Sequence, residues 1–217
     1  MRKKCYYSFM RNISLVEGEL YHIYNRAVDK RDIFTDPRDL DRFFSGIRQF
    51  NTPNILGSLN RGHSVSTKPE TKLVELIAYC VNPNHFHFIL RQISERGIER
   101  FMHKLGMGYS KYFNTKYARI GALFQGKFGA KHIDSNEYLL HLSAYINLNG
   151  KAHGRGHRVS TLGRSSWDEY VENGQNELCK TEIILGQFEN KSKYKKFAEE
   201  SLESIITRKI LLHDLQT

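Results

Sequence analysis

The chain has 217 residues, a formal net charge of +10 at pH 7 and a hydrophobic fraction of 40%. This composition suffices for a folded core and excludes extensive disorder. No apolar run approaches the roughly 20 residues that a membrane-spanning helix needs, and no apolar signal segment follows the basic start, so we expect a cytoplasmic protein without a membrane partner. The cysteines, Cys5, Cys80 and Cys179, match neither a disulfide framework nor a zinc spacing. The charge excess favours a polyanionic partner such as nucleic acid, although a merely soluble basic protein would share it.

The first half of the chain predicts a strand, a helix and a hairpin. Residues 20–28 are rich in aromatic and β-branched types, which favours a strand. Asp36-Pro37 then supplies an N-cap and a first helical position for a helix that runs to about Phe50. Residues 72–81 and 85–91 predict two strands, and the Asn-Pro-Asn sequence between them predicts the turn of a hairpin.

The second half adds a helix, a strand and more helices. Ser94 is expected to cap a helix that runs to about Tyr117, and the alternating residues 122–133 predict a further strand. Asp134 or Ser135 then caps a helix that Gly150 should end. The order βαββαβ predicts an α+β fold, a ferredoxin-like antiparallel sheet with its helices on one face, plus a C-terminal helical extension. The other face would be free to serve as a binding or catalytic surface.

Two histidines stand next to each other on one face of a predicted strand. His85 and His87 are two residues apart, so their side chains point the same way, while Phe86 and Phe88 point toward the helices. Paired imidazoles on an exposed sheet face can hold a divalent metal, but a further ligand is needed. Two surface histidines placed there by chance remain the alternative.

A tyrosine and an asparagine share one face of the last helix of the core. Tyr145 and Asn149 are four residues apart, and His141 lies one turn before them. A tyrosine hydroxyl can act as a nucleophile, and an asparagine oxygen can act as a neutral ligand. A packed core tyrosine is the alternative reading of Tyr145.

Together these features resemble a known family. The stretches that carry the resemblance are residues 21–26, 82–87, 112–114, 121–128, 138–140 and 145–149. They occur in order and with consistent spacing over roughly residues 18–172. In them the sequence is similar to the single-tyrosine HUH transposases of the IS200-like superfamily, and most similar to the REP-associated tyrosine transposases.

The resemblance implies a role for each of four residues. His85 and His87 would bind Mg²⁺ or Mn²⁺, with Asn149 as the third protein ligand. Tyr145 would attack a DNA phosphodiester, which would give a 5′-phosphotyrosine linkage and a free 3′-hydroxyl. The implied activity is a metal-dependent single-stranded DNA endonuclease and transposase that cleaves and rejoins DNA near hairpins.

The resemblance also suggests how the chain is divided. We expect a basic N-terminal segment (1–17), a nuclease and transposase core (18–150), a connector (151–175) and a helical C-terminal extension (176–217).

A seven-residue sequence at 61–67 is nearly repeated at 155–161, in predicted loops, and is too short to be a structural repeat.

Basic, polar and aromatic side chains could contact single-stranded or hairpin DNA by charge or by stacking on unpaired bases. For any one of them the alternative is a solvated surface charge. The candidates are Arg26, Lys111, Tyr112, Lys116, Arg119, Gln125, Lys127 and Lys131.

Two other functions compete with the transposase. One is a non-catalytic regulator of the same fold that binds hairpin DNA or RNA and forms no covalent adduct. The other is a metal-free endoribonuclease that uses histidine as acid or base. The sequence leaves a monomer and a homodimer equally open.

Overall fold

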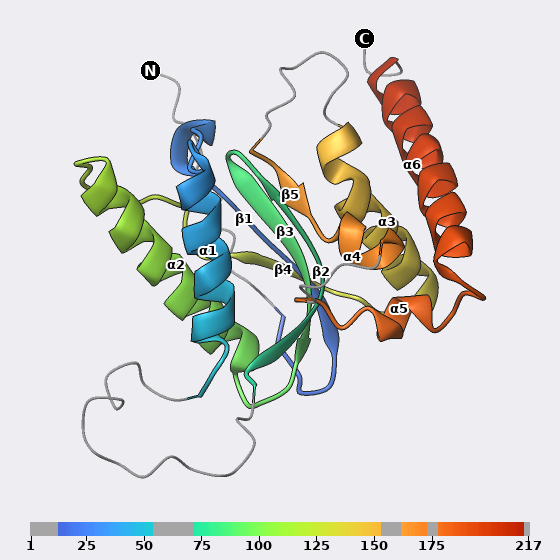
Figure 1. Cartoon of the computed structure of the whole chain (residues 1–217), viewed down its shortest axis with the longest axis horizontal. Helices are drawn as coiled ribbons and strands as arrows, with labels where there is room; N and C mark the ends of the chain where they lie inside the picture. The colour runs from blue at the N-terminus through green and yellow to red at the C-terminus, as the bar shows by residue number, and fades with distance from the viewer. Residues whose placement is uncertain (1–12, 54–71, 153–161, 173–177, 215–217) are drawn as a thin grey trace.

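The computed structural model describes residues 13–53, 72–152, 162–172 and 178–214 (Figure 1). Most of the basic N-terminal segment and both copies of the short repeat lie outside these residues. The strands are β1 (Leu20–Arg26), β2 (Val74–Asn82), β3 (His85–Gln92), β4 (Gly129–His132) and β5 (Arg164–Ser165). The helices are a 3-10 turn, η1 (Val28–Lys30), then α1 (Pro37–Phe50), α2 (Gly97–Lys116), α3 (Asn136–Ala152), α4 (Trp167–Val171), α5 (Glu182–Leu185) and α6 (Lys191–Asp214). None of the helices formed by the described residues is long and apolar enough to cross a membrane.

The strands form one antiparallel sheet in the order β4-β1-β3-β2-β5. Its first four strands have the order expected of the ferredoxin-like βαββαβ arrangement, and β5 extends the sheet beyond β2. The α+β class predicted from the sequence is therefore confirmed. The central position of β3, between β1 and β2, places its side chains in the middle of both sheet faces.

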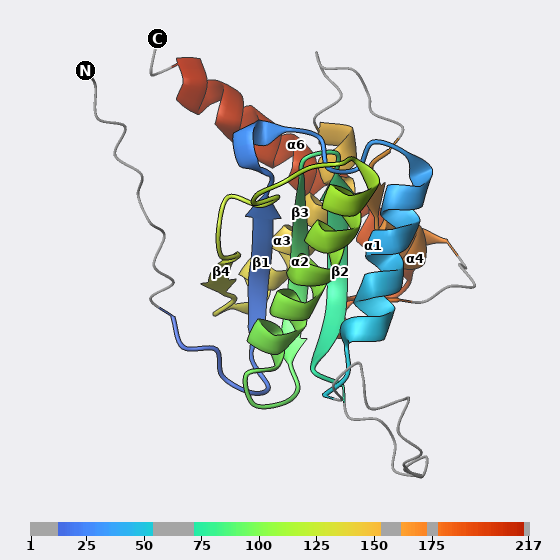
Figure 2. The same ribbon diagram turned by 90° about the vertical axis from the view of Figure 1, so that its left-hand side faces the viewer.

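The helices occupy both faces of the sheet, which corrects the expectation that one face is free. Figures 1 and 2 show α1 and α2 on one side of the sheet, with α3 and α6 on the other. Phe86 and Phe88 of β3 belong to the core under α1 and α2, whereas Ile89 belongs to a second core with α3, α4, α5 and α6. We call the side that carries α3 the α3 face. Because His85 and His87 have the same parity as Ile89, they lie on the α3 face.

Some predicted boundaries differ from the structure. The strand predicted over 122–133 is shortened to β4, because Gly126 takes a φ of +134° that breaks the extended run. Helix α2 begins at Gly97 and not after Ser94, since Ser94 and Gly97 form a turn closed by a 2.8 Å backbone hydrogen bond. Helix α3 continues past Gly150 to Ala152.

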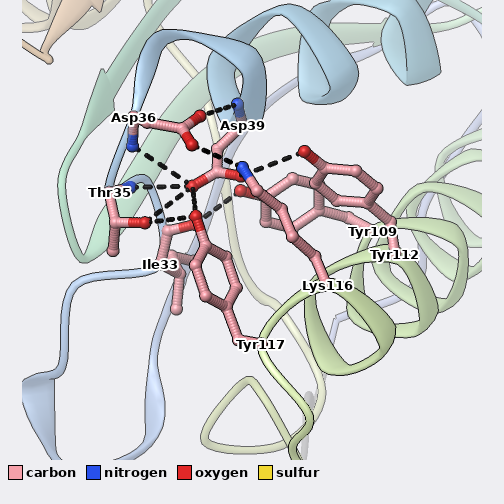
Figure 3. Close-up of polar contacts among 8 residues, drawn as sticks. All are labelled: Ile33, Thr35, Asp36, Asp39, Tyr109, Tyr112, Lys116 and Tyr117. Atoms are coloured by element: carbon pink, nitrogen blue, oxygen red, sulfur yellow. Dashed lines mark hydrogen bonds and ion pairs between the residues drawn. The ribbon is translucent and has the colours of Figure 1, made fainter.

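A buried carboxylate ties the start of α1 to the end of α2 (Figure 3). Asp39 is fully buried, and its two oxygens accept hydrogen bonds from Thr35, Tyr112 and Tyr117 and an ion pair from Lys116, at 2.7 to 3.1 Å. Burial alone would raise the pKa of Asp39, but the hydrogen bonds from Lys116, Thr35 and Tyr117 outweigh it and lower the pKa to about 2. The carboxylate is thus held in its charged form.

The predicted cap of α1 is part of the same cluster. The Asp36 side chain accepts a 3.0 Å hydrogen bond from the Asp39 backbone N–H, and the Asp39 side chain accepts one from the Asp36 N–H. This is a capping box, which satisfies two amides that the first helical turn leaves without partners. The expected N-cap at Asp36 and the helix start at Pro37 are confirmed.

We predict that Asp39→Asn lowers the free energy of unfolding by about 3 kcal/mol, because the Lys116 charge would lose its buried partner. Chemical denaturation at pH 7 measures this, and Asp41→Asn, an exposed change on the same helix, should have little effect. The Asp39 pKa is lower in the folded than in the unfolded chain, so its contribution exists above pH 4 and is lost toward pH 2. A variant whose acid sensitivity equals that of the wild type would contradict this account.

Candidate active site

The hydrogen bonds around His85 fix which ring nitrogen carries its proton. The Asn84 side-chain nitrogen donates to the backbone carbonyl of Lys30 at 3.0 Å, which turns the Asn84 carbonyl oxygen toward His85. That oxygen lies 2.6 Å from His85 Nδ1 and can only accept, so Nδ1 must donate. A neutral His85 ring therefore presents a lone pair at Nε2, the form in which imidazole binds a metal.

His87 stacks on a second histidine that the sequence did not single out. His87 Nδ1 lies 2.9 Å from Nε2 of His22 on β1, and the ring centroids are 5.2 Å apart. Burial, together with a smaller contribution from the charge of Lys131 on β4, lowers the pKa of His22 to about 4. His22 is therefore neutral near pH 7 and can accept the Nδ1 proton of His87. A partner of this kind orients a metal-binding imidazole so that it coordinates through Nε2.

Tyr24 packs against the same histidines because β4 carries a glycine opposite it. Tyr24 pairs with His87 on one side and with Gly129 on the other, and its ring lies 5.1 Å from His22 and 6.1 Å from His87. A Cβ atom at Gly129 would come within 2.4 Å of the Tyr24 ring. The absence of a side chain at residue 129 thus leaves room for the Tyr24 ring.

Helix α3 brings Tyr145 and Asn149 to the histidines. The rings of Tyr145 and His87 have centroids 6.2 Å apart, and Tyr145 is half-buried. Asn149 is fully buried, and its carbonyl oxygen accepts a 2.9 Å hydrogen bond from the Asn82 amide. His141 does not join them, because its Nδ1 contacts Ser201 Oγ of α6 at 3.1 Å.

Buried hydrogen bonds hold α3 on the side that faces away from His85 and His87. Asn147 donates to the Tyr194 hydroxyl of α6 at 2.8 Å and accepts from the Ser166 hydroxyl at 2.5 Å. Ser166 also accepts from the backbone N–H of Tyr79 in β2 at 3.0 Å. Side chains on a helix advance by about 100° per residue, so Asn147 projects away from Tyr145 and Asn149. The helix is therefore anchored to both the sheet and α6 while its other side faces the histidines.

Any metal ion bound by this cluster would need the side-chain amide of Asn149 as a ligand. The described part of the chain holds no group of three or more His, Cys, Asp or Glu side chains placed to bind a metal. Two imidazoles and the Asn149 oxygen would make a mixed nitrogen and oxygen set of the kind that Mn²⁺ accepts. Asn149 Nδ2 is buried and has no hydrogen-bond partner among the described residues. An unpartnered buried nitrogen of this kind costs about 1–3 kcal/mol, whereas the oxygen of the same amide accepts the hydrogen bond from Asn82.

The structure separates the candidate DNA-contacting residues into groups. Arg26 lies opposite His85 in the register and Lys131 opposite His22, so both stand on the α3 face. Lys131 Nζ lies 4.5 Å from the centre of the Tyr138 ring of α3. The other candidates lie on α2 or in the segment between α2 and β4: Lys111, Tyr112, Lys116, Arg119, Gln125 and Lys127.

Some of these candidates already have internal partners. Tyr112 and Lys116 both bind Asp39, and the Lys116 Nζ also pairs with Asp36 at 2.6 Å. Lys127 lines a cavity of about 870 Å³ between α2 and residues 121–128, together with Arg96 and Arg100. A contact with DNA stays a prediction for every member of the set.

Comparison with known proteins supports the family resemblance. Residues 60–149 match the family described as "Transposase IS200 like", a region that contains His85, His87, Tyr145 and Asn149. The resemblance to IS200-like transposases that was stated from the sequence is thus confirmed over this region. No curated protein matches the chain significantly. Among solved structures, one titled "Structure of the REP associates tyrosine transposase bound to a REP hairpin" is 18% identical, with a TM-score of 0.49, and the match covers 76% of this chain and 87% of that one.

We predict that His22 makes the protein less stable as the pH falls from 7 to 5. Its folded pKa of about 4 lies below the ordinary histidine value, so over this range the unfolded chain binds a proton that the folded chain does not. The expected loss is about 2 kcal/mol. Urea unfolding at the two pH values measures it, and His22→Phe should remove this part of the difference. His103→Phe, on the exposed side of α2, is the control; an equal effect of both substitutions would refute the assignment.

Proposed function

We propose that the protein is a metal-dependent single-stranded DNA endonuclease and transposase that works through a 5′-phosphotyrosine intermediate at hairpin-bearing DNA, most like the REP-associated enzymes. One observation carries the proposal. Tyr145 of α3 lies against His87 of the central strand, with His85 and the Asn149 oxygen on the same face, inside the region that matches the transposase family. A single chain supplies all four side chains, so the proposal needs no second subunit.

The residues present fit a divalent cation. His85 would coordinate through Nε2, because its Nδ1 must donate to Asn84, and Asn149 would coordinate through the oxygen that accepts from the Asn82 amide. His87 is held by His22 at Nδ1 and would also coordinate through Nε2. A bound Mg²⁺ or Mn²⁺ would polarise the scissile phosphate and offset the charge that develops during in-line displacement.

The reaction itself is an exchange of one phosphodiester for another. The Tyr145 oxygen attacks the phosphorus and gives up its proton to solvent, the bond from phosphorus to the 3′-oxygen breaks, and the released 3′-oxygen takes up a proton. The new bond joins the 5′-phosphate to Tyr145. Attack by another 3′-hydroxyl reverses these steps and rejoins DNA, so no external energy source is required.

The positive charge on the α3 face supports a nucleic acid substrate. Arg26 and Lys131 flank the histidines on β1 and β4, where they could neutralise phosphates on either side of the scissile bond. The net charge of +10 would add sequence-independent attraction with a steep salt dependence.

We predict that Tyr145→Phe abolishes the covalent adduct and leaves hairpin binding within about twofold, since only the nucleophilic oxygen is removed. The measurement is an SDS gel with a labelled hairpin oligonucleotide, beside a binding titration. Tyr117→Phe, a matched loss of a phenol from the opposite side of the sheet, should retain the adduct. An adduct that persists in Tyr145→Phe would exclude Tyr145 as the nucleophile.

Chelation should stop the reaction reversibly. We predict that EDTA eliminates the adduct and that Mn²⁺ or Mg²⁺ restores it, because the bound cation would offset the negative charge that develops on the scissile phosphate. DNA binding without an adduct under every metal condition would favour the non-catalytic regulator. Cleavage that requires a ribose 2′-hydroxyl and persists in EDTA would favour the endoribonuclease.

A further inference from the structure

Asn82 stands between two of the proposed metal ligands. It is the last residue of β2, it is paired in register with His85, and only 6% of its surface is exposed. Its amide nitrogen lies 3.1 Å from His85 Nε2 and 2.9 Å from the Asn149 carbonyl oxygen. One nitrogen atom therefore contacts the ligand atoms that a strand and a helix bring together from opposite sides.

The two contacted atoms both present lone pairs. His85 Nε2 is an acceptor because its Nδ1 donates to Asn84, and the Asn149 oxygen is an acceptor by its chemistry. Two lone pairs directed at one place, on a half-buried His85 and a fully buried Asn149, favour a donor or a cation there. The Asn82 NH₂ group, which carries two protons, is such a donor, with one hydrogen bond to each atom. A divalent ion would take the same role at nearly the same position.

We propose that Asn82 is a fourth side chain of the metal site. Without an ion, its NH₂ group holds His85 and Asn149 together. With an ion present, its carbonyl oxygen faces the metal. The exchange needs only rotation about the terminal side-chain torsion, which is soft in asparagine. Amide oxygens suit Mg²⁺ and Mn²⁺, so the residue fits both states.

This inference rests on the proposed metal site. It identifies the group that contacts His85 and Asn149 when no ion is bound. When no ion is bound, the Asn82 amide nitrogen contacts one ligand atom of His85 and one of Asn149. Asn82 thereby keeps the ligand atoms in place for the ion. It therefore acts as a ligand and as a positioning residue.

The test is Mn²⁺ binding to the full-length protein without DNA, followed by electron paramagnetic resonance. Asn82→Leu keeps the approximate size of the side chain and removes both polar atoms, so we expect affinity to fall at least tenfold. Asn82→Asp places a charged oxygen ligand at the same position, so we expect affinity to rise at least tenfold. Thermal unfolding of each variant shows whether it is folded.

A third variant separates ligation from a general effect of charge or packing. Asn82→Cys would offer a thiolate, which should shift the preference from Mn²⁺ toward Cd²⁺ and produce a sulfur-to-cadmium charge-transfer band in the ultraviolet. The wild type, which keeps the native Cys80 and Cys179, should lack this band and is the matched control.

The outcomes distinguish the inference from the proposed function. Asn82 variants that bind Mn²⁺ as the wild type does, or an Asn82→Leu variant that binds it more tightly, would overturn the role of Asn82 while His85→Ala still abolished binding. A wild type that forms the Tyr145 adduct in EDTA and binds no Mn²⁺ would instead overturn the metal site itself, and the inference with it.

Discussion

The position of Tyr145 depends on the hydrogen bonds that Asn147 makes on the far side of α3. The Asn147 amide nitrogen donates to Tyr194 of α6, and its oxygen accepts from Ser166. The Ser166 hydroxyl in turn accepts from the backbone of β2. Because all three side chains are buried in the second core, rotation of α3 would leave several polar groups without partners, each at a cost of about 1–3 kcal/mol. The C-terminal helices therefore contribute to the site by holding α3 in place.

Much of the fold could be predicted from local patterns. The cap at Asp36, the apolar spacing of α1 and the hairpin turn at 82–84 depend on neighbouring residues, and these elements occur nearly where the sequence places them. The helix-covered second face was missed, because the face on which α3 packs is set by contacts distant in sequence. A signal was present in β2, where the run Leu76–Val81 is apolar at every position, as in strands buried on both sides.

The site was predictable to the extent that it follows from spacing within one element. The period of two in β3 places His85 and His87 together, and the period of the helix places Tyr145 and Asn149 together. His22 and Asn82 were missed because their relation to these residues depends on strand register, which no local pattern reveals. For the same reason nothing in α2 alone indicated that Tyr112 and Lys116 bind a carboxylate 73 and 77 residues away.

The two outermost strands also affect how the protein avoids association with itself. Strand β4 has four residues and carries Lys131, and β5 has only two residues. Short or charged edge strands offer few backbone groups to a neighbouring chain and so discourage intermolecular strand pairing. In this strongly basic chain, short and charged edges can therefore keep exposed backbone groups from becoming a template for aggregation.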